Sequence, residues 1–420
     1  MTPAARVQAA IDILAGLEQT QQPADRYLKD FFRARRYAGS KDRRAISERV
    51  FDILRHHARF AHRMGDADPR ALAIASVLAE EANIESLFTG GYGPAPLTEA
   101  ERAAIAATPA PMPPHVAGEY PQWLAPSLSR AFGGALAEEM AAVHARAPVD
   151  LRVNTLKASR PNVLAGLKAE GFAPAATPYS PVGLRIPPGE GSAALARSPL
   201  FLSGALEFQD EAAQIASLLA GARPGMRVLD LTAGAGGKAL AMAAAMNNQG
   251  AILAFDHNPR RLAPLADRAE RAGATCIALA EGRGGPLWGD GTFDLVFLDA
   301  PCSGSGTWRR QPELRRRLTP ARLAELTGIQ DALLDEAARH VVERGAGPGG
   351  RLVYATCSLL PQENEDRVAA FLLRNPGFRQ LEAASAWEGR IPGLAQDFRA
   401  SPARTGTDGF YCALLAREGG

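Results

Sequence analysis

The sequence contains little lysine and little net charge. Five of its 47 basic residues are lysines: Lys29, Lys41, Lys157, Lys168 and Lys238. The other 42 are arginines, so most cationic contacts are expected to be forked guanidinium contacts. With 45 acidic residues the formal net charge is only +2, which excludes a polycation that coats nucleic acid with its whole surface.

Long apolar runs and disulfide patterns are also missing. No stretch of about 18 apolar residues occurs, so no membrane-spanning helix is expected. The apolar N-terminal stretch contains Asp12 and lacks a small-residue cleavage site, so it does not have the pattern of a signal peptide. Four scattered cysteines predict a reducing, cytoplasmic setting: Cys276, Cys302, Cys357 and Cys412. Neither a Cys-x-x-Cys pair nor a His-x-Glu pattern is present, so no metal site is expected, and no obligate protein partner is indicated.

What is present is enough apolar sequence for real cores, in 420 residues that predict two or three domains. Residues 1–65 hold 13 basic and 7 acidic side chains, a net +6, whereas residues 66–150 hold 4 and 11, a net −7. Apolar residues at helical spacing predict helices in the first segment: Val7, Ala10, Ile11, Leu14 and Leu17, then Ile46, Val50, Ile53 and Leu54. Six basic residues cluster around the Gly39-Ser40 turn between them: Arg33, Arg35, Arg36, Lys41, Arg43 and Arg44. The cluster is either a solvated face or a contact for an RNA backbone, and both interpretations stay open.

Three domains are predicted along the chain. Residues 1–140 form a helical domain whose last part, residues 89–126, is rich in proline and reads as a linker or irregular connection. Residues 145–205 mix short strands with a helix and predict a small α/β module. Residues 206–420 alternate short apolar strands with longer helices, which predicts a doubly wound, Rossmann-like α/β domain with ligands at the carboxyl ends of its strands.

A glycine-rich loop follows the first strand of the third domain. It consists of Thr232, Ala233, Gly234, Ala235, Gly236, Gly237 and Lys238. Glycines permit a sharp turn and close approach of a ligand, and the helix that follows favours negative charge at its N-terminus. The second strand ends in Asp256, an acid suited to a ribose diol. Alone, this loop does not distinguish a nicotinamide cofactor from S-adenosylmethionine, nor exclude a purely structural turn.

Two cysteines come directly after later strands, where such a fold builds its site. Residues 297–307 read Phe-Leu-Asp-Ala-Pro-Cys-Ser-Gly-Ser-Gly-Thr, and residues 353–365 read Val-Tyr-Ala-Thr-Cys-Ser-Leu-Leu-Pro-Gln-Glu-Asn-Glu. An isolated cysteine is more often an inert small apolar residue than a nucleophile. Cys302 and Cys357 differ from Cys276 and Cys412 because each leads into a polar segment with turn residues.

These two segments resemble those of the RNA (cytosine-5)-methyltransferases of the RsmB/Sun/NOP type. Segments elsewhere are similar to the same family: residues 152–155, 209–214, 309–313, Gln330 and residues 408–411. Residues 1–65 resemble the NusB-like helical extension of the bacterial ribosomal RNA members. The resemblance implies a class I methyltransferase domain, S-adenosylmethionine as cofactor with S-adenosylhomocysteine as product, and an RNA substrate.

The resemblance also implies residue roles. Cys357 is expected to add to carbon 6 of cytosine, Cys302 to assist release of the product, and Asp299 to hydrogen-bond the base beside the cofactor. The cofactor is expected to contact the glycine-rich loop, Asp256, Glu281 and Asp299. The loop departs from the family pattern because Ala235 replaces a proline, and Glu281 stands where an aspartate is usual.

Three functions stay open at this stage: an RNA cytosine-5 methyltransferase, which we expect, a nicotinamide oxidoreductase, and a non-catalytic RNA-binding protein. The NusB-like extension favours small-subunit ribosomal RNA as the substrate, with transfer RNA as the alternative. Besides the N-terminal cluster, a second basic group beside the catalytic loop is expected to contact RNA: Arg309, Arg310, Arg315, Arg316 and Arg317.

Overall fold

The structure is a computed structural model that describes residues 1–80, 83–189, 192–280, 282, 288–343 and 349–418. The chain divides into two compact units. A helical unit contains Met1–Ala145 together with the later segment Trp308–Thr319, and an α/β unit contains Arg146–Thr307 and Pro320–Gly420. Nothing in the sequence indicated that residues 308–319 return to the helical unit.

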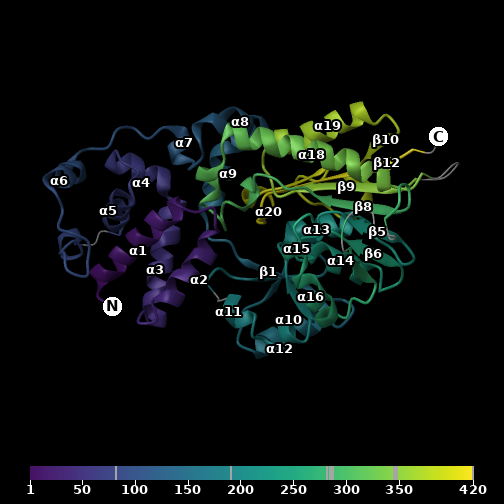
Figure 1. Ribbon diagram of the computed structural model, residues 1–420, viewed down its shortest axis with the longest axis horizontal. Coiled ribbons are helices and arrows are strands. Elements are labelled where there is room, and N and C mark those ends of the chain that lie inside the picture. The colour runs from purple at the N-terminus through teal and green to yellow at the C-terminus, as the bar shows by residue number, and fades with distance from the viewer. Residues whose placement is uncertain (81–82, 190–191, 281, 283–287, 344–348, 419–420) are drawn as a thin grey trace. The chain divides into compact units, whose positions relative to one another are not determined.

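The helical unit is built around three packed helices, α1 (Pro3–Glu18), α3 (Ser40–Arg55) and α5 (Pro69–Ala79) (Figure 1). The apolar stripes predicted from the sequence form its core, and nearly all of their residues are buried. Helices α2 (Ala24–Ala34) and α4 (His57–Met64) pack beside them. Burial of one apolar face therefore stabilises each of these helices.

The proline-rich segment contains helices, contrary to the prediction of an irregular connection. Helices α6 (Glu99–Ala106), α7 (Pro114–Ala117) and α8 (Ala125–Phe132) lie within it or end it, and α9 (Leu136–His144) follows. Prolines occupy the first turn of α7 and α8. Proline is tolerated there because its missing N–H has no intrahelical partner to lose.

Arginines attach the returning segment to the helical unit. In its short helix α17 (Leu314–Arg317), Arg315 donates to the carbonyl of Arg55 at 3.2 Å. Arg317 donates to the carbonyl groups of residues 20–22 at 3.0–3.2 Å. Arg316 forms an ion pair with Glu18 at 3.2 Å. The structure therefore does not support the predicted RNA contact for Arg315, which is buried, or for Arg317, whose Nη donors bind the protein's own carbonyl groups.

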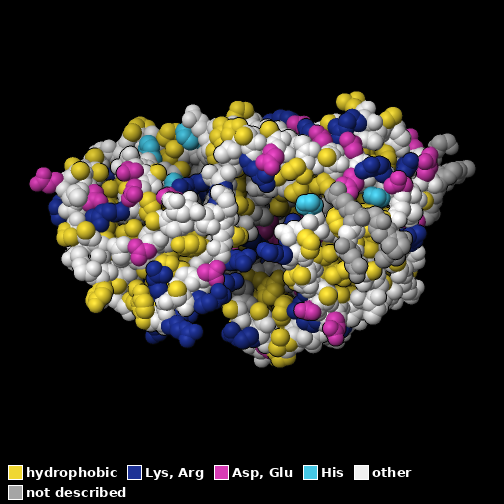
Figure 2. Space-filling model, viewed as in Figure 1, with side chains coloured by type: hydrophobic (Ala, Val, Ile, Leu, Met, Phe, Trp, Pro, Cys, Tyr) yellow, Lys and Arg dark blue, Asp and Glu magenta, His cyan; other side chains and the backbone are white. Residues whose placement is uncertain are grey.

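The N-terminal basic cluster lies around the start of α3. Figure 2 shows Lys and Arg side chains gathered on the lower part of the helical unit in this view. Arg33 and Arg44 are exposed and form ion pairs with Asp30 and Glu48, three and four residues away. Exposed pairs of this kind contribute little to stability, so the cluster keeps the solvent access that an RNA contact needs.

The α/β unit begins with a four-stranded antiparallel sheet of order β2-β3-β1-β4. Its strands are β1 (Val149–Val153), β2 (Ala175–Ala176), β3 (Gly183–Ile186) and β4 (Leu206–Phe208). Helix α10 (Arg160–Ala169) packs on the sheet through Val163 and Leu167, and the shorter helices α11 (Ser192–Leu195) and α12 (Pro199–Leu202) follow. This is the small α/β module that the sequence predicted.

The main sheet has the order β10-β12-β9-β8-β5-β6-β7, with β11 pairing to β12. Its parallel strands are β5 (Arg227–Asp230), β6 (Ala251–Ala254), β7 (Ile277–Leu279), β8 (Leu295–Asp299) and β9 (Arg351–Thr356). Its antiparallel strands are β10 (Phe378–Leu381), β11 (Phe398–Ala400) and β12 (Phe410–Arg417). The short helix α20 (Pro402–Thr405) precedes β12.

Helices cover both faces of this sheet (Figure 1). One face packs against α13 (Glu211–Leu219), α14 (Gly237–Ala245), α15 (Pro259–Leu262) and α16 (Pro264–Ala272). The other packs against α18 (Pro320–His340) and α19 (Glu365–Arg374). Alternate residues of β5 serve the two cores, since Val228 belongs to the first and Leu229 to the second. The predicted doubly wound fold is confirmed.

Candidate active site

Three neighbouring parallel strands end at one edge of the main sheet. Asp230 ends β5, Asp299 ends β8 and Thr356 ends β9. The register pairs Asp230 with Phe297 and Asp299 with Ala355, so the loops that follow the three strands begin side by side. Ligand sites of doubly wound sheets form at such an edge.

The structure brings the two predicted cysteines together. Cys302 Sγ lies 3.4 Å from Cys357 Sγ, within hydrogen-bond distance for sulfur. The hydrogen bond to Cys357, followed by burial, raises the pKa of the Cys302 thiol well above its usual value. Cys302 therefore remains protonated at neutral pH, and its S–H can be donated to Cys357. Cys412 is buried in β12, where burial raises its pKa to about 12, as expected for an inert residue.

Lys238 is directed at Asp299. It lies in the first turn of α14, and its Nζ forms a 2.6 Å ion pair with Asp299 Oδ2. Burial, the largest single effect, lowers the pKa of Lys238, but the charge of Asp299 and its hydrogen bond, together with the charges of Asp230 and Cys357, outweigh burial and raise it. Cys357 is also close enough to interact electrostatically with the ammonium group. The last residue of the glycine-rich loop thus supplies positive charge near Cys357, a contact that the sequence did not indicate.

The glycine-rich loop makes two tight turns. Gly234 and Gly236 have φ values of 52° and 81°, which a residue with a side chain rarely adopts. A Cβ added to Gly236 would lie 2.1 Å from Leu265 Cδ1. The Gly234 N–H donates to Asp256 Oδ2 at 2.9 Å. Asp256 therefore holds the loop in place as well as standing where a ribose diol is expected.

Two arginines hold the outward carbonyl groups of the same loop. Arg152 Nη1 donates to the Gly237 carbonyl at 3.1 Å, and Arg268 Nη1 donates to the Ala235 carbonyl at 2.5 Å. Glu207 in turn forms ion pairs with Arg268 and Arg271. These contacts restrain the peptide at Ala235, where the family usually has a proline.

A cavity of about 410 Å³ lies beyond the end of β6. Asp256 lines it together with apolar residues that include Phe255, Pro259, Leu262 and Ala280. An acid at the rim and an apolar lining suit a nucleoside, whose ribose is polar and whose base is flat and largely apolar on its faces. Glu281, the other expected contact on this side, lies outside the described residues.

Unsatisfied polar atoms mark the ligand side of the loop. Both carboxylate oxygens of Asp230 and the hydroxyl of Thr232 are buried without a hydrogen-bond partner among the described residues. Burial raises the pKa of Asp230 to about 7. Buried polar atoms are rarely left unpaired, so these groups fit a ligand that carries a cation and hydrogen-bonding groups, such as the amino-acid end of S-adenosylmethionine. Asp230 was not predicted as a site residue, although an acid directly before the loop is a signal that could have found it.

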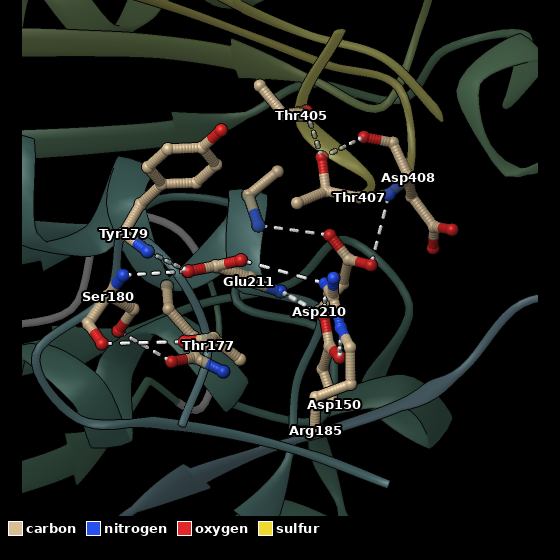
Figure 3. Close-up of polar contacts among 12 residues, drawn as sticks. Asp150, Thr177, Tyr179, Ser180, Arg185, Asp210, Glu211, Thr405, Thr407 and Asp408 are labelled. Atoms are coloured by element: carbon tan, nitrogen blue, oxygen red, sulfur yellow. Dashed lines mark hydrogen bonds and ion pairs between the residues drawn. The ribbon is translucent and has the colours of Figure 1, made fainter. Parts of the chain in front are cut away.

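A polar network joins the small module to the main sheet (Figure 3). Arg185 of β3 binds both oxygens of Asp150 on β1, at 2.6 and 2.8 Å. Asp150 also accepts the Glu211 N–H, and Glu211 accepts the N–H groups of Tyr179 and Ser180 at 2.7 Å. The network fixes the entry to α13, which lies within residues 209–214, one of the segments that resemble the methyltransferase family.

The same network reaches the last strand of the main sheet. The Asp408 N–H donates to Asp210 Oδ2 at 3.1 Å. The next residue, Gly409, donates its N–H to the carbonyl of Gly306 in the Cys302 loop at 2.8 Å. A chain of hydrogen bonds therefore connects the small module, through residues 408–409, to the Cys302 loop.

Two features are missing from the described residues, a cluster of metal ligands and a membrane-spanning helix. Within the described ranges, no group of three His, Cys, Asp or Glu side chains is arranged to hold a metal ion. No helix in the described part of the chain is long and apolar enough to cross a membrane.

Comparison with known proteins gives consistent matches. Residues 217–416 match the family model of the 16S rRNA methyltransferases RsmB/F. Residues 120–189 match the ferredoxin-like domain of RsmF/B-like methyltransferases. The ribosomal RNA small subunit methyltransferase B of Pseudomonas syringae pv. tomato is 34% identical over 308 residues, which cover 72% of this chain and 67% of that protein. The chain spans about two thirds of the length of the first curated relatives that it matches.

Solved structures with the same fold cover more of the chain. The crystal structure of PH0851 is 28% identical, with a TM-score of 0.78 over 99% of both chains. A methyltransferase homologue from Pyrococcus horikoshii is 26% identical, with a TM-score of 0.61 over 73% of this chain and 98% of that one. The first likeness extends across both units, and the second covers about three quarters of the chain.

Proposed function

Because the chain belongs to the RsmB/F family of methyltransferases, which use S-adenosylmethionine, we propose that it methylates carbon 5 of a cytosine in RNA through a covalent adduct. The observation that supports this most directly is the 3.4 Å contact between Cys302 and Cys357 beside the Lys238–Asp299 ion pair.

The chemistry requires a nucleophile because carbon 5 of cytosine is itself a poor one. Cys357 attacks carbon 6 as a thiolate, which forms a carbon–sulfur bond and moves electron density to carbon 5. S-adenosylmethionine supplies an electrophilic methyl group to that carbon. Transfer of the carbon 5 proton to a base, such as solvent water, and departure of the Cys357 thiolate then break the carbon–hydrogen and carbon–sulfur bonds and restore the aromatic ring.

Two charged groups prepare Cys357 and the base for this reaction. The ammonium of Lys238 stabilises the thiolate, whose proton must leave before attack. Asp299 is held by Lys238, yet about 33% of its side chain stays exposed, so it can also meet the cytosine ring. In this arrangement Asp299 hydrogen-bonds the base, while Lys238 fixes the direction of its carboxylate.

Cys302 has a separate task after the methyl transfer. Cys302 lies next to Cys357 and keeps its proton. It is therefore placed to donate a hydrogen bond to the Cys357 thiolate as that thiolate leaves carbon 6. We assign it to release of the product. A target base must leave its stack to reach this pair, which is the usual requirement for enzymes that act on a base.

Small-subunit ribosomal RNA is the proposed substrate. The relatives in Pseudomonas syringae and Erwinia tasmaniensis are both named ribosomal RNA small subunit methyltransferase B. The exposed basic residues around the start of α3 offer a path for the RNA backbone on the helical unit, which we propose to be NusB-like and RNA-binding. Bisulfite sequencing of RNA from a strain without this protein should show a ribosomal cytosine that loses its methyl group. Loss confined to transfer RNA would contradict the ribosomal assignment.

Two cysteine variants test the mechanism. Cys357→Ala should abolish methyl transfer from labelled cofactor, because no adduct forms. Cys302→Ala should retain attack but leave enzyme trapped on RNA as a covalent complex that resists denaturing gels. Turnover by Cys357→Ala at the wild-type rate would disprove the assignment.

The cofactor is tested by ligand-induced stabilisation. S-adenosylhomocysteine should raise the melting temperature, whereas NADH and NADPH should not. A ligand raises the melting temperature only if it binds to the folded protein. RNA binding without any methyl incorporation would instead favour a non-catalytic RNA-binding protein.

A further inference from the structure

A buried acid beneath the two cysteine loops has no assigned role. Glu363 belongs to the 3-10 turn Pro361–Glu363 that follows β9, and its side chain is fully buried. Its carboxylate accepts four hydrogen bonds from three residues. The donors are the Ser303 N–H at 2.8 Å, the Ser303 hydroxyl at 2.5 Å, the Ser358 hydroxyl at 2.5 Å and Gln330 Nε2 at 3.1 Å.

The two serines are the residues that directly follow the two cysteines. Ser303 comes after Cys302, and Ser358 comes after Cys357. One carboxylate therefore binds both loops, in each case at the residue directly after the cysteine. Because a charged acceptor makes shorter and stronger hydrogen bonds than a neutral one, this is a firm link between loops that start on different strands.

Neighbouring contacts strengthen the link. Ser305 Oγ lies 3.0 Å from Ser358 Oγ and accepts the Leu359 N–H at 2.8 Å. The Gly306 N–H donates to the Cys357 carbonyl at 2.9 Å. Gln330 also donates to the carbonyl of Pro301, which precedes Cys302. The backbone on both sides of the thiol pair is thus restrained.

A merely structural link would not need a charge. Burial of an ionised carboxylate is costly, and a neutral glutamine of the same shape could accept hydrogen bonds in its place. The charge has one further effect in this position. It lies close enough to Cys302 to disfavour a second negative charge there, in addition to the effect of Cys357.

We propose that Glu363 is a positioning residue for the methyl transfer: it fixes the spacing of the two thiols through Ser303 and Ser358, and its charge keeps the shared proton on Cys302 so that Cys357 is the nucleophile. The proposal rests on the function proposed above, but the order in which the two thiols ionise is a property of the protein alone. It can be measured without RNA, cofactor or turnover.

The test is site-resolved alkylation of the full-length protein with iodoacetamide across a range of pH, followed by peptide mass spectrometry. Wild-type protein should be labelled about 10-fold or more faster at Cys357 than at Cys302, since each unit by which the pKa of Cys302 is raised lowers its thiolate fraction about tenfold. In Glu363→Gln the labelling of Cys302 should rise and its pH profile should move to lower pH. The ratio of the Cys357 rate to the Cys302 rate should then fall below its wild-type value.

A matched control lies two residues away. Glu365 forms an ion pair with Arg399 at 3.2 Å and has no part in the thiol network. Glu365→Gln should leave the ratio of labelling rates unchanged, and Cys276 provides an internal reference in every digest. An unchanged ratio in Glu363→Gln, with an unchanged melting temperature, would overturn the proposal.

Single-serine variants keep the proposal testable if Glu363→Gln does not fold. Ser303→Ala releases only the Cys302 loop and Ser358→Ala only the Cys357 loop, so each should change the reactivity of its own cysteine more than that of the other. Equal labelling ratios in wild type and both variants would also overturn it. If the alkylation order is as expected but Cys357→Ala still methylates RNA, the proposed function fails while the role of Glu363 in ordering the thiols stands.

Discussion

The cofactor loop and the thiol loops lie at the same edge of the main sheet but treat buried polar atoms in opposite ways. On the cofactor side, Asp230 and Thr232 have buried oxygens without a hydrogen-bond partner in the described part of the chain. On the thiol side, the buried carboxylate of Glu363 accepts four hydrogen bonds. We propose that a ligand completes the first side, whereas the protein's own groups already organise the second.

This difference follows from what each side does. A cofactor enters and leaves in every cycle, so the groups that bind it must be available, and their desolvation is compensated only when it is bound. A nucleophile and its partner must keep one geometry throughout the reaction, which favours groups already fixed by the protein. Lys238 connects the two sides, because it starts in the cofactor loop and ends on Asp299.

The largest expected effect comes from breaking this connection. Lys238→Met removes the ammonium from Asp299 and from the surroundings of Cys357, with most of the side-chain volume retained. Methyl transfer should fall by about 10²- to 10³-fold, the loss in rate that is typical when one preorganised charged group is removed from a reacting site. Calorimetry should show S-adenosylhomocysteine affinity reduced by less than about tenfold. An equal loss of affinity and rate would show that Lys238 serves the cofactor rather than the thiols.

Much of this site could be predicted from the sequence because its residues follow strands. The positions of Cys302, Cys357, Asp299 and Asp256 after apolar runs were sufficient to place them at one sheet edge. Partnerships were not predictable, because Lys238–Asp299 and Glu363–Ser303 join residues about 60 positions apart through side-chain directions. The return of residues 308–319 to the helical unit was missed for a similar reason: its arginines look like an RNA contact until their carbonyl acceptors are seen.

The next effect concerns stability on the unsatisfied side. Burial raises the pKa of Asp230 from 3.8 to about 7, so the folded protein binds a proton that the unfolded chain releases near pH 4. The contribution of this bound proton to the free energy of unfolding is complete below about pH 4. It is lost as the pH rises through about 7, by up to about 4 kcal/mol. Asp230→Asn should therefore be more stable than wild type at pH 8 in urea denaturation, and the difference should shrink at pH 4.

Ligand binding should reverse that order. The same Asp230→Asn variant loses the carboxylate that a cationic ligand group would satisfy, so its affinity for S-adenosylhomocysteine should fall by about 10-fold or more. Saturating ligand should then raise the melting temperature of wild type more than that of the variant. A variant that is destabilised equally at both pH values, with unchanged affinity, would contradict the assignment of Asp230 to the ligand side.

The smallest effect tests how the cofactor loop is held without the usual proline. Arg268→Met removes the hydrogen bond to the Ala235 carbonyl, and Arg271→Met is the matched control because Arg271 also pairs with Glu207. A hydrogen bond from a charged group contributes about 1.5–3 kcal/mol where buried and less in this exposed setting, so S-adenosylhomocysteine affinity should weaken about 3- to 5-fold in Arg268→Met. Arg271→Met should leave the affinity unchanged.

The alkylation ratio of Cys357 to Cys302 should stay at its wild-type value in both variants, because the thiol side is fixed by Glu363 and not by the cofactor loop. A change in that ratio in Arg268→Met would show that the two sides are coupled and that the contrast between them is weaker than their hydrogen bonds indicate.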